Sequence, residues 1–123
     1  MIRLYMSMSV DGFVAGPGDS TEEPMGRGGF RLFNWLDDRN SDGPSGQVYR
    51  ECLATGALIA GRRTYEHAGR SGLLDEIELH VVNVLLGQGR RLFDNLPAEY
   101  IELEPLRQLP ARDVTHLRYR VLK

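Results

Sequence analysis

The fold of this chain depends most on residues 56–87, which read GALIAGRRTYEHAGRSGLLDEIELHVVNVLLG. Residues 57–61 (ALIAG) are short and continuously apolar, which is typical of a strand buried on both faces of a parallel sheet. Residues 62–70 then favour a helix, and residues 77–87 are a second β-prone stretch. A strand, a helix and a strand in this order predict an α/β domain in which only a short polar bridge joins the helix to the second strand.

The N-terminal stretch alternates apolar and polar side chains, which predicts a strand with one apolar face. That face consists of Ile2, Leu4, Met6, Met8 and Val10. The other face ends in the small hydroxyl side chains of Ser7 and Ser9, which leave room for another group beside the strand. The Gly- and Pro-rich residues 11–20 (DGFVAGPGDS) that follow predict a loop.

Residues 11–46 show no strong periodicity, and loops of this length usually cover a site or are disordered. The large apolar side chains of Phe30, Phe33, Trp35 and Leu36 argue against disorder. We therefore predict a short helical turn that folds back on the domain, with Trp35 in the wall of a substrate pocket.

The rest of the chain predicts one more helix and two more strands. The helix covers residues 45–56, with Ser45 as its N-cap, Gly56 as its C-cap and a buried stripe of Val48, Cys52 and Leu53. The strands are residues 100–106 and 114–122. The resulting order, β-α-β-α-β-β-β, predicts a mixed, mostly parallel sheet with an antiparallel C-terminal edge.

Length and composition restrict the class of protein. The 123 residues fit a single domain covering residues 1–123, and 15 Lys and Arg against 17 Asp and Glu leave no electrostatic footprint for nucleic acid. The single thiol, Cys52, cannot form an internal disulfide, and no apolar stretch is long enough to span a membrane. We therefore expect a cytoplasmic protein without a membrane partner. The three histidines lack zinc spacing, so no metal site is expected.

Residues 61–64 (GRRT) are the first candidate for binding chemistry. Gly61 lets the backbone approach a ligand closely, and the N–H groups that open the following helix favour an anion. Arg62 and Arg63 add positive charge, and Thr64 adds a hydroxyl donor. The plainer interpretation is a helix N-terminus with solvated arginines, which the spacing alone favours.

Asp11 and Gly12 are the second candidate. Asp-Gly is a common turn dipeptide, in which the carboxylate bonds to nearby backbone. A carboxylate at the carboxyl end of a central strand also lies where α/β sites gather, so Asp11 could orient a substrate or relay a proton.

Two further motifs favour structural roles. Asp75 and Glu76 stand just before a strand, where one carboxylate can accept bonds from backbone N–H groups. Residues 87–93 (GQGRRLF) contain Gly-x-Gly, but Leu92 stands where a dinucleotide fingerprint requires a third glycine. Leu92 and Phe93 are therefore expected to anchor the turn in the core.

Four stretches together resemble the dihydrofolate-reductase-like superfamily. They are SMSVDGFVAGPG (7–18), LIAGRRTYE (58–66), GLLDEIELHVVNVLLGQGRRLF (72–93) and THLRYRV (115–121). More narrowly, they resemble bacterial proteins related to the reductase domain of the bifunctional riboflavin-biosynthesis deaminase/reductase. The resemblance implies a three-layer domain around a mixed sheet.

The resemblance also implies an activity, which is NADPH-dependent reduction of a small heterocyclic or carbonyl/imine substrate by hydride transfer. By the same resemblance, the residues beside the nicotinamide and the substrate are Ser9, Asp11, Gly12 and Ala15, with Asp11 as the first choice for a catalytic group. The residues near the cofactor phosphates are Gly61, Arg62, Arg63 and Thr64. The resemblance thus favours phosphate binding by these residues, whereas their spacing alone favours solvated arginines at a helix N-terminus.

The chain is shorter in its middle than the proteins it resembles. The shortened part usually holds further strands, a helix and a Gly-Gly pair ending a central strand, whereas Gly28-Gly29 here lies in the long loop. Because buried strand edges need partners, residues 57–61 should pair directly with the first strand, or the chain should form a close homodimer, of which strand exchange is the specific version. The alternative function is a non-enzymatic, shortened relic of the fold that binds a small molecule or a protein through the loop around Trp35. Asn83 favours it, since proline is usual at that position.

Overall fold

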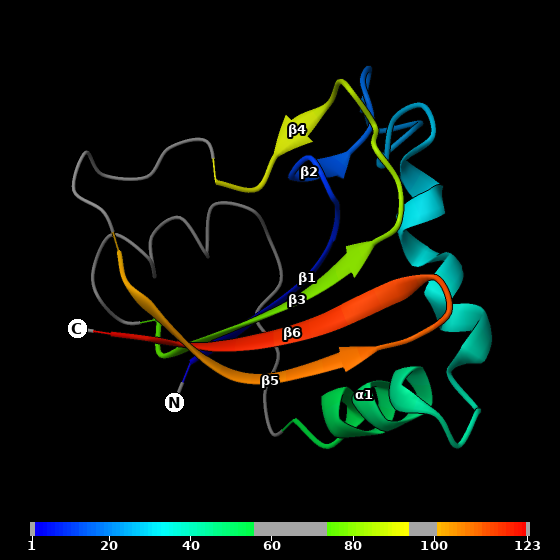
Figure 1. The fold of residues 1–123 in the computed structure, drawn as a ribbon. Helices are drawn as coiled ribbons and strands as arrows, with labels where there is room; N and C mark the ends of the chain where they lie inside the picture. The colour runs from blue at the N-terminus through cyan, green and yellow to red at the C-terminus, as the bar shows by residue number, and fades with distance from the viewer. Residues whose placement is uncertain (1, 56–73, 94–100, 123) are drawn as a thin grey trace.

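The computed structural model of the chain describes residues 2–55, 74–93 and 101–122 (Figure 1). The strands are β1 (Arg3–Ser9), β2 (Phe13–Ala15), β3 (Glu76–Val82), β4 (Arg90–Arg91), β5 (Leu103–Pro110) and β6 (Val114–Val121). The helices are the 3₁₀ helix η1 (Gly29–Asp38) and the α-helix α1 (Pro44–Leu53). The predicted strand at 57–61 and helix at 62–70 lie outside the described residues.

The main sheet is mixed and has the strand order β1-β3-β6-β5. β1 and β3 are parallel, with Ser9 opposite Val82 at their carboxyl ends. β3 and β6, and β6 and β5, are antiparallel. These pairings confirm a mixed sheet with an antiparallel C-terminal edge; among the described strands of this sheet, one pairing is parallel and two are antiparallel. β2 and β4 form a separate antiparallel ribbon at the carboxyl ends of β1 and β3 (Figure 1).

One face of the sheet is apolar, as the alternation in β1 predicts for Leu4, Met6 and Met8. Ile2 and Val10, which were predicted on the same face, lie beyond the ends of β1 and are exposed. Ile77 and Leu79 of β3 are buried on this face, and Met6 of β1 packs against them. The β2–β4 ribbon adds Val14, and the turn after β4 adds the fully buried Leu92. Because strand side chains alternate with a period of two, the same strands present different residues to the other face.

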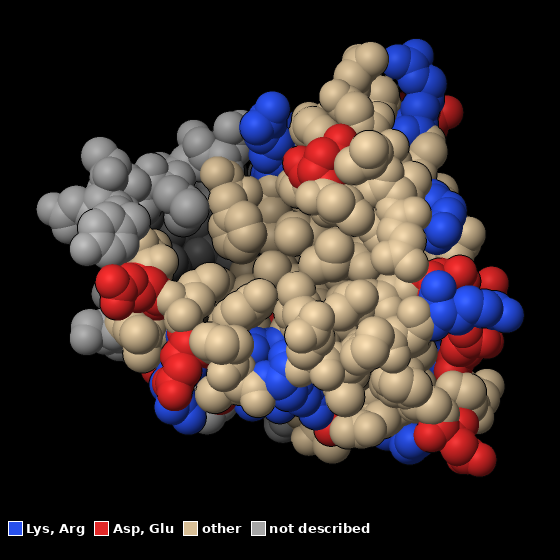
Figure 2. Space-filling view, viewed as in Figure 1, with Lys and Arg blue, Asp and Glu red and all other residues tan. Residues whose placement is uncertain are grey.

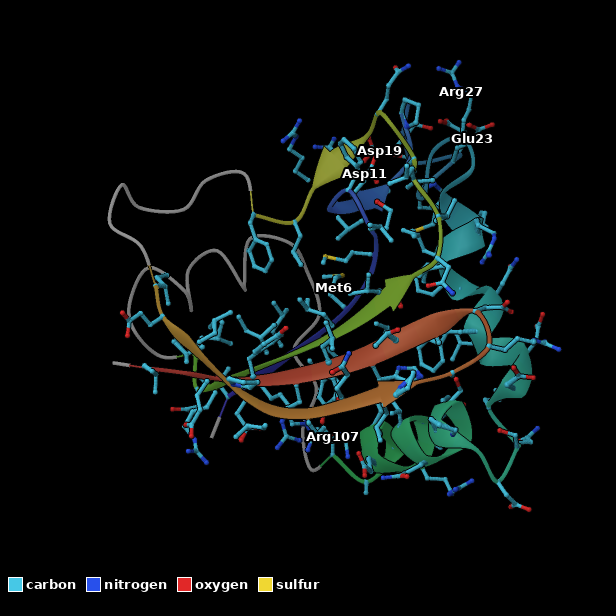
Figure 3. All side chains as sticks on the ribbon, in the orientation of Figure 1. Met6, Asp11, Asp19, Glu23, Arg27 and Arg107 are labelled. Carbon is cyan, nitrogen blue, oxygen red and sulfur yellow. The ribbon has the colours of Figure 1, made fainter. Side chains whose placement is uncertain are left out.

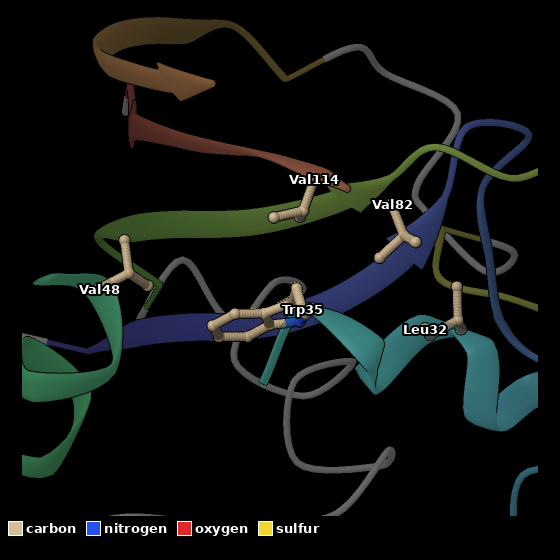
Figure 4. Packing of buried hydrophobic residues seen from close by; sticks show 5 residues of the cluster. All are labelled: Leu32, Trp35, Val48, Val82 and Val114. Carbon is tan, nitrogen blue, oxygen red and sulfur yellow. The ribbon is translucent and has the colours of Figure 1, made fainter. Parts of the chain in front are cut away.

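The helices η1 and α1 cover that other face. Its apolar core consists of Leu32, Trp35, Val48, Val82 and Val114, seen together in Figure 4. Burying a large apolar side chain of this kind contributes about 1.5–3 kcal/mol. The predicted helical turn folded back on the domain is therefore confirmed.

The three-residue period of a 3₁₀ helix explains how η1 divides its side chains. Leu32 and Trp35, three residues apart, point into the core. Phe30 and Phe33, also three residues apart, lie on another side of the helix and are exposed by 65% and 38%. The helix thus has one buried and one exposed apolar stripe.

The helix predicted at residues 45–56 is α1, but its start, its end and its buried stripe need correction. Its C-cap is Ala54 and not Gly56. Gly43 is the N-cap and Pro44 the first helical residue, a position where the missing N–H of proline costs nothing. The hydroxyl of Ser45 instead faces the sheet. Leu53 is 67% exposed, because five residues after Val48 the helix has turned away from the core.

The described residues include no membrane-spanning helix, and the face drawn in Figure 2 shows no broad basic patch. No helix among these residues is long and apolar enough to cross a bilayer. On the face drawn in Figure 2, basic and acidic side chains are interspersed around an uncharged centre.

Candidate functional site

The carboxyl ends of the parallel strands β1 and β3 meet at one edge of the sheet, where ligand sites of α/β proteins gather. Beyond the strands the two chain segments stay together, because the Val10 N–H donates to the Val84 carbonyl over 2.9 Å. Figure 3 places Asp11 here, beside β2 and β4 and remote from Arg107 near α1.

The Asp11 carboxylate joins the two segments and accepts three hydrogen bonds. Oδ1 accepts from the Ser9 hydroxyl over 2.5 Å and from the Leu86 N–H over 3.1 Å. Oδ2 accepts from the Gly87 N–H over 2.8 Å. We call this arrangement of Ser9, Asp11 and the Leu86 and Gly87 amides the Asp11 bracket. A carboxylate held in this way can orient a substrate as a hydrogen-bond acceptor or receive a proton as a base.

The charge state of Asp11 follows from these bonds. The hydrogen bond from Ser9, followed by those from the Gly87 and Leu86 amides, lowers the pKa of Asp11 below its ordinary value. The side chain is solvent-exposed, so its carboxylate is both ionised at neutral pH and accessible to a ligand.

Ser9 and Ala15 hold the loop in shape and do not face open space. Ser9 is fully buried, and its Oγ also accepts from the Phe13 N–H over 3.0 Å. Ala15 is buried with its carbonyl oxygen against Gly89, where a Cβ would come within 1.9 Å of that oxygen. Gly89 therefore has to be glycine for the β2–β4 ribbon to form.

Gly12 is the open position of this loop. Its φ of +90° disfavours other residues, and a Cβ built on it would meet no atom within 4 Å. Its carbonyl accepts from the Leu92 N–H over 3.0 Å. Asp11 and Gly12 are thus the two predicted residues that remain accessible to a ligand, whereas Gly61, Arg62, Arg63 and Thr64 lie outside the described residues.

β4 adds two arginines that sequence reasoning did not consider as binding residues. The Arg91 guanidinium lies over the Phe13 ring, with Cζ 5.4 Å from the ring centroid. Arg90 forms an ion pair with Asp19. Residues 87–93 were considered only as a dinucleotide fingerprint. The signal that could have identified the two arginines is the pairing of β4 with β2, which places Arg91 opposite Phe13, the residue after Gly12. The prediction that Leu92 anchors the turn is confirmed, but Phe93 is exposed.

Trp35 lies in the core, so it does not form an open pocket wall as expected. Its side chain is only 5% exposed, and its indole Nε1–H donates to the Ser7 hydroxyl over 3.0 Å. The group for which Ser7 leaves room beside β1 is therefore this indole. The ring also contacts His80 and His116, with centroids 4.7 and 5.0 Å away.

His80 and His116 form a buried pair that the sequence does not reveal. The antiparallel register of β3 and β6 places them directly opposite each other, with their Nδ1 atoms 2.9 Å apart. His116 Nε2 also bonds to the Ser45 hydroxyl over 3.0 Å. Burial lowers the pKa of His80 to about 3 and that of His116 to about 4, so both are neutral at pH 7. Within the described ranges no group of three or more residues could hold a metal ion.

An ion network lies next to the histidine pair on the same face. Glu78 is fully buried and pairs with Arg107 at 2.8 Å and with Arg118 at 3.2 Å. Arg107 also makes two bonds to Glu51 of α1, and these lower the pKa of Glu51 to about 2. We call the following residues the buried polar cluster: Ser45, Glu51, Glu78, His80, Arg107, His116 and Arg118.

Asp75 and Glu76 have the structural role expected of them. The Asp75 carboxylate accepts a hydrogen bond from the Ile2 N–H over 2.8 Å. This bond confirms that one carboxylate of the pair bonds to a backbone N–H group. Glu76 pairs with Arg3 of β1 at 2.5 Å. Both contacts hold β1 and β3 together at their amino ends, opposite the Asp11 bracket.

Comparison with known proteins finds similarity in structure but not in sequence. No protein-family model and no curated protein matches the chain. A crystal structure from Shewanella sp. PV-4, provisionally named as a riboflavin biosynthesis protein, superposes with a TM-score of 0.60 at 16% identity, over 100% of both chains. At this identity the match establishes the fold, which agrees with the resemblance seen in the sequence.

Two larger proteins give weaker matches. RibD of Acinetobacter baumannii aligns at 26% identity over 52% of this chain and 19% of that chain, with a TM-score of 0.44. A pyrimidine reductase-like protein of Corynebacterium diphtheriae aligns at 15% identity over 89% of this chain and 48% of that chain, with a TM-score of 0.45. The chain thus spans less than half of either protein.

Proposed function

We propose that the protein is an NADPH-dependent reductase that transfers hydride to a small heterocyclic or carbonyl/imine substrate. The observation that carries this proposal is the Asp11 bracket, which presents an ionised carboxylate and the open Gly12 at the carboxyl ends of β1 and β3. The sequence resemblance and the fold shared with the Shewanella protein support the same class.

The described residues fit the nicotinamide and substrate end of such a site. A carboxylate has about four lone-pair positions, and the three donors around Asp11 leave one for an N–H group of a ligand. Gly12 leaves space for a planar ring beside that carboxylate. NADPH supplies the hydride when it is bound, and Asp11 orients the substrate by accepting its N–H. By resemblance, residues 61–64 contact the cofactor phosphates.

The first test is cofactor binding and oxidation by the purified chain. We expect NADPH to raise the melting temperature and quench protein fluorescence, and we expect slow NADPH oxidation with a heterocyclic imine. Asp11→Asn should lower kcat/KM at least tenfold, because the amide presents N–H where the carboxylate accepts one. Asp19→Asn, in the neighbouring loop, is the matched control. No binding at millimolar NADPH would reject the proposal.

We further propose that the chain acts as a homodimer in the cytoplasm. The shortened middle of the sequence motivates the dimer, because residues 57–61 need a strand partner from the same or a second chain. Light scattering coupled to size exclusion should give twice the monomer mass, in the same sample used for the NADPH titration. A monomer mass would reject the dimer. The cytoplasmic location is part of the same proposal, and the single thiol, which requires no oxidising compartment, is compatible with it.

A binding module without catalysis is the second candidate, and one observation favours it. Phe30 and Phe33, three residues apart on η1, present exposed rings, whereas large aromatic groups are usually buried. In that case Phe30→Ser with Phe33→Ser would abolish partner capture and leave folding intact. NADPH oxidation that is lost in Asp11→Asn would exclude this candidate as the main function.

A further inference from the structure

We propose that Arg91 is a binding residue for a phosphoryl oxyanion, held ready over Phe13 beside Gly12. This deepens the proposed function, because it adds an anionic group to the ligand that Asp11 and Gly12 receive. The oxyanion can belong to the substrate or to the cofactor, and the experiment below separates the two sources.

Backbone pairing places Arg91 at the site. In the β2–β4 ribbon Phe13 is the register partner of Arg91. The next residue, Leu92, donates its N–H to the Gly12 carbonyl over 3.0 Å and is itself fully buried. Arg91 is therefore fixed in the chain between a buried anchor and the open loop position.

The guanidinium is held by the Phe13 ring. Phe13 is buried, so its ring has a fixed position, and Cζ of Arg91 at 5.4 Å from the centroid lies within cation–π range. Holding the side chain in this way reduces the freedom it would lose on binding a ligand. Because the planar guanidinium carries five N–H donors, a stacked arginine can still present a donor pair at its edge.

Arg91 also differs from the other arginine of β4 in charge pairing. Arg90 is neutralised by Asp19. Across the ranges that the structure describes, no Asp or Glu forms a salt bridge with Arg91. Asp11, two residues before Phe13, directs its oxygens to Ser9, Leu86 and Gly87 instead. The positive charge of Arg91 is thus available to an anion at the same edge where Asp11 accepts an N–H.

The pair Arg90 and Arg91 offers a matched experiment. Inorganic pyrophosphate is titrated by calorimetry at low ionic strength into the full chain and into Arg91→Ala, Arg91→Lys and Arg90→Ala. We expect Arg91→Ala to weaken binding at least tenfold, Arg91→Lys to weaken it less, and Arg90→Ala to change it less than twofold. Circular dichroism melts of each variant identify any change caused by unfolding. Equal pyrophosphate affinity in the wild type and folded Arg91→Ala would overturn the proposal.

The source of the oxyanion is read from a second titration with NADPH and NADH. If the 2′-phosphate of the cofactor is the ligand, Arg91→Ala weakens NADPH binding and leaves NADH binding unchanged. If the pyrophosphate of the cofactor is the ligand, Arg91→Ala weakens the binding of both NADPH and NADH. If Arg91→Ala weakens only the binding of inorganic pyrophosphate, the oxyanion belongs to the substrate. A wild-type chain that binds pyrophosphate through Arg91 but no nicotinamide cofactor would keep this inference and reject the proposed function.

Discussion

The Asp11 bracket and the buried polar cluster both gather charged and polar side chains on the same sheet, but they differ in how deeply these groups are buried. In the buried polar cluster, Glu78 is fully enclosed and both of its neighbouring arginines are directed at protein carboxylates. In the bracket, Asp11 is exposed and retains an acceptor position. The difference teaches that a dense polar cluster here marks the attachment of α1 to the sheet, while the sparser loop carries the candidate site.

The largest effect should come from breaking the buried polar cluster at Glu78. Glu78→Gln leaves Arg107 and Arg118 without their buried carboxylate, which typically costs about 3–5 kcal/mol. Urea unfolding measures the loss of unfolding free energy. Glu104→Gln is the matched control, because it removes an exposed pair with Arg120 that contributes at most about 1 kcal/mol. Equal losses in both variants would contradict the distinction between the two regions.

Acid should destabilise the protein through the histidine pair. The pKa values of His80 and His116, about 3 and about 4 in the folded state, lie below the unfolded value near 6.5. The unfolded state therefore binds more protons, so stability is complete above pH 6.5 and falls as pH drops toward 4. Each histidine contributes a slope of at most about 1.4 kcal/mol per pH unit.

Urea unfolding between pH 7 and pH 5 measures this slope. Glu51, whose pKa is lowered to about 2, titrates below this window in both states and does not interfere. Arg107, Arg118 and Glu78 are the charged side chains that act on the pair. The double variant His80→Gln with His116→Gln should flatten the dependence of unfolding free energy on pH. An unchanged slope in this variant would mean that other groups cause the loss of stability in acid.

A smaller loss is expected at the contact between β1 and η1. Ser7→Ala leaves the Trp35 indole N–H buried without its acceptor, which costs about 1–3 kcal/mol. In a Trp35→Phe background there is no indole N–H to leave unpaired. Ser7→Ala should therefore cost less unfolding free energy there than it does in the wild type. Denaturant unfolding followed by circular dichroism measures the effect, because Trp35→Phe removes the single tryptophan of the chain. Additive losses would show that the hydrogen bond is not the cause.

The smallest change in global stability, but the clearest local one, should follow Asp11→Asn. Loss of the carboxylate weakens the bonds from the Leu86 and Gly87 amides, so their hydrogen exchange should accelerate about tenfold, a rate change of the size expected for one weakened hydrogen bond. Nuclear magnetic resonance follows both amides, and Asp19→Asn serves as the control. Unchanged exchange at both amides would mean that the bracket is not a joint between the two segments.

Several elements could be predicted because they depend on local periodicity. The alternation of β1, the fold-back of η1 and the backbone bond of Asp75 are all confirmed. The helix bounds and the exposure of Leu53 were wrong, because Pro44 sets the start of α1 and the turn of the helix sets its buried side. In the candidate site, the sequence indicated Asp11 and Gly12 but not their neighbour Arg91.

The sequence by itself determined the mixed α/β class, the apolar face of β1 and the Asp-Gly turn at its end. Only the tertiary structure decided which distant polar groups meet. His80 and His116 are 36 residues apart, and Asp11 and Leu86 are 75 apart. Contacts at such separations depend on strand register, since a shift by one residue moves every side chain to the opposite face. Local patterns predict the strands, whereas the way the strands pair determines the histidine pair, the Asp11 bracket and the position of Arg91.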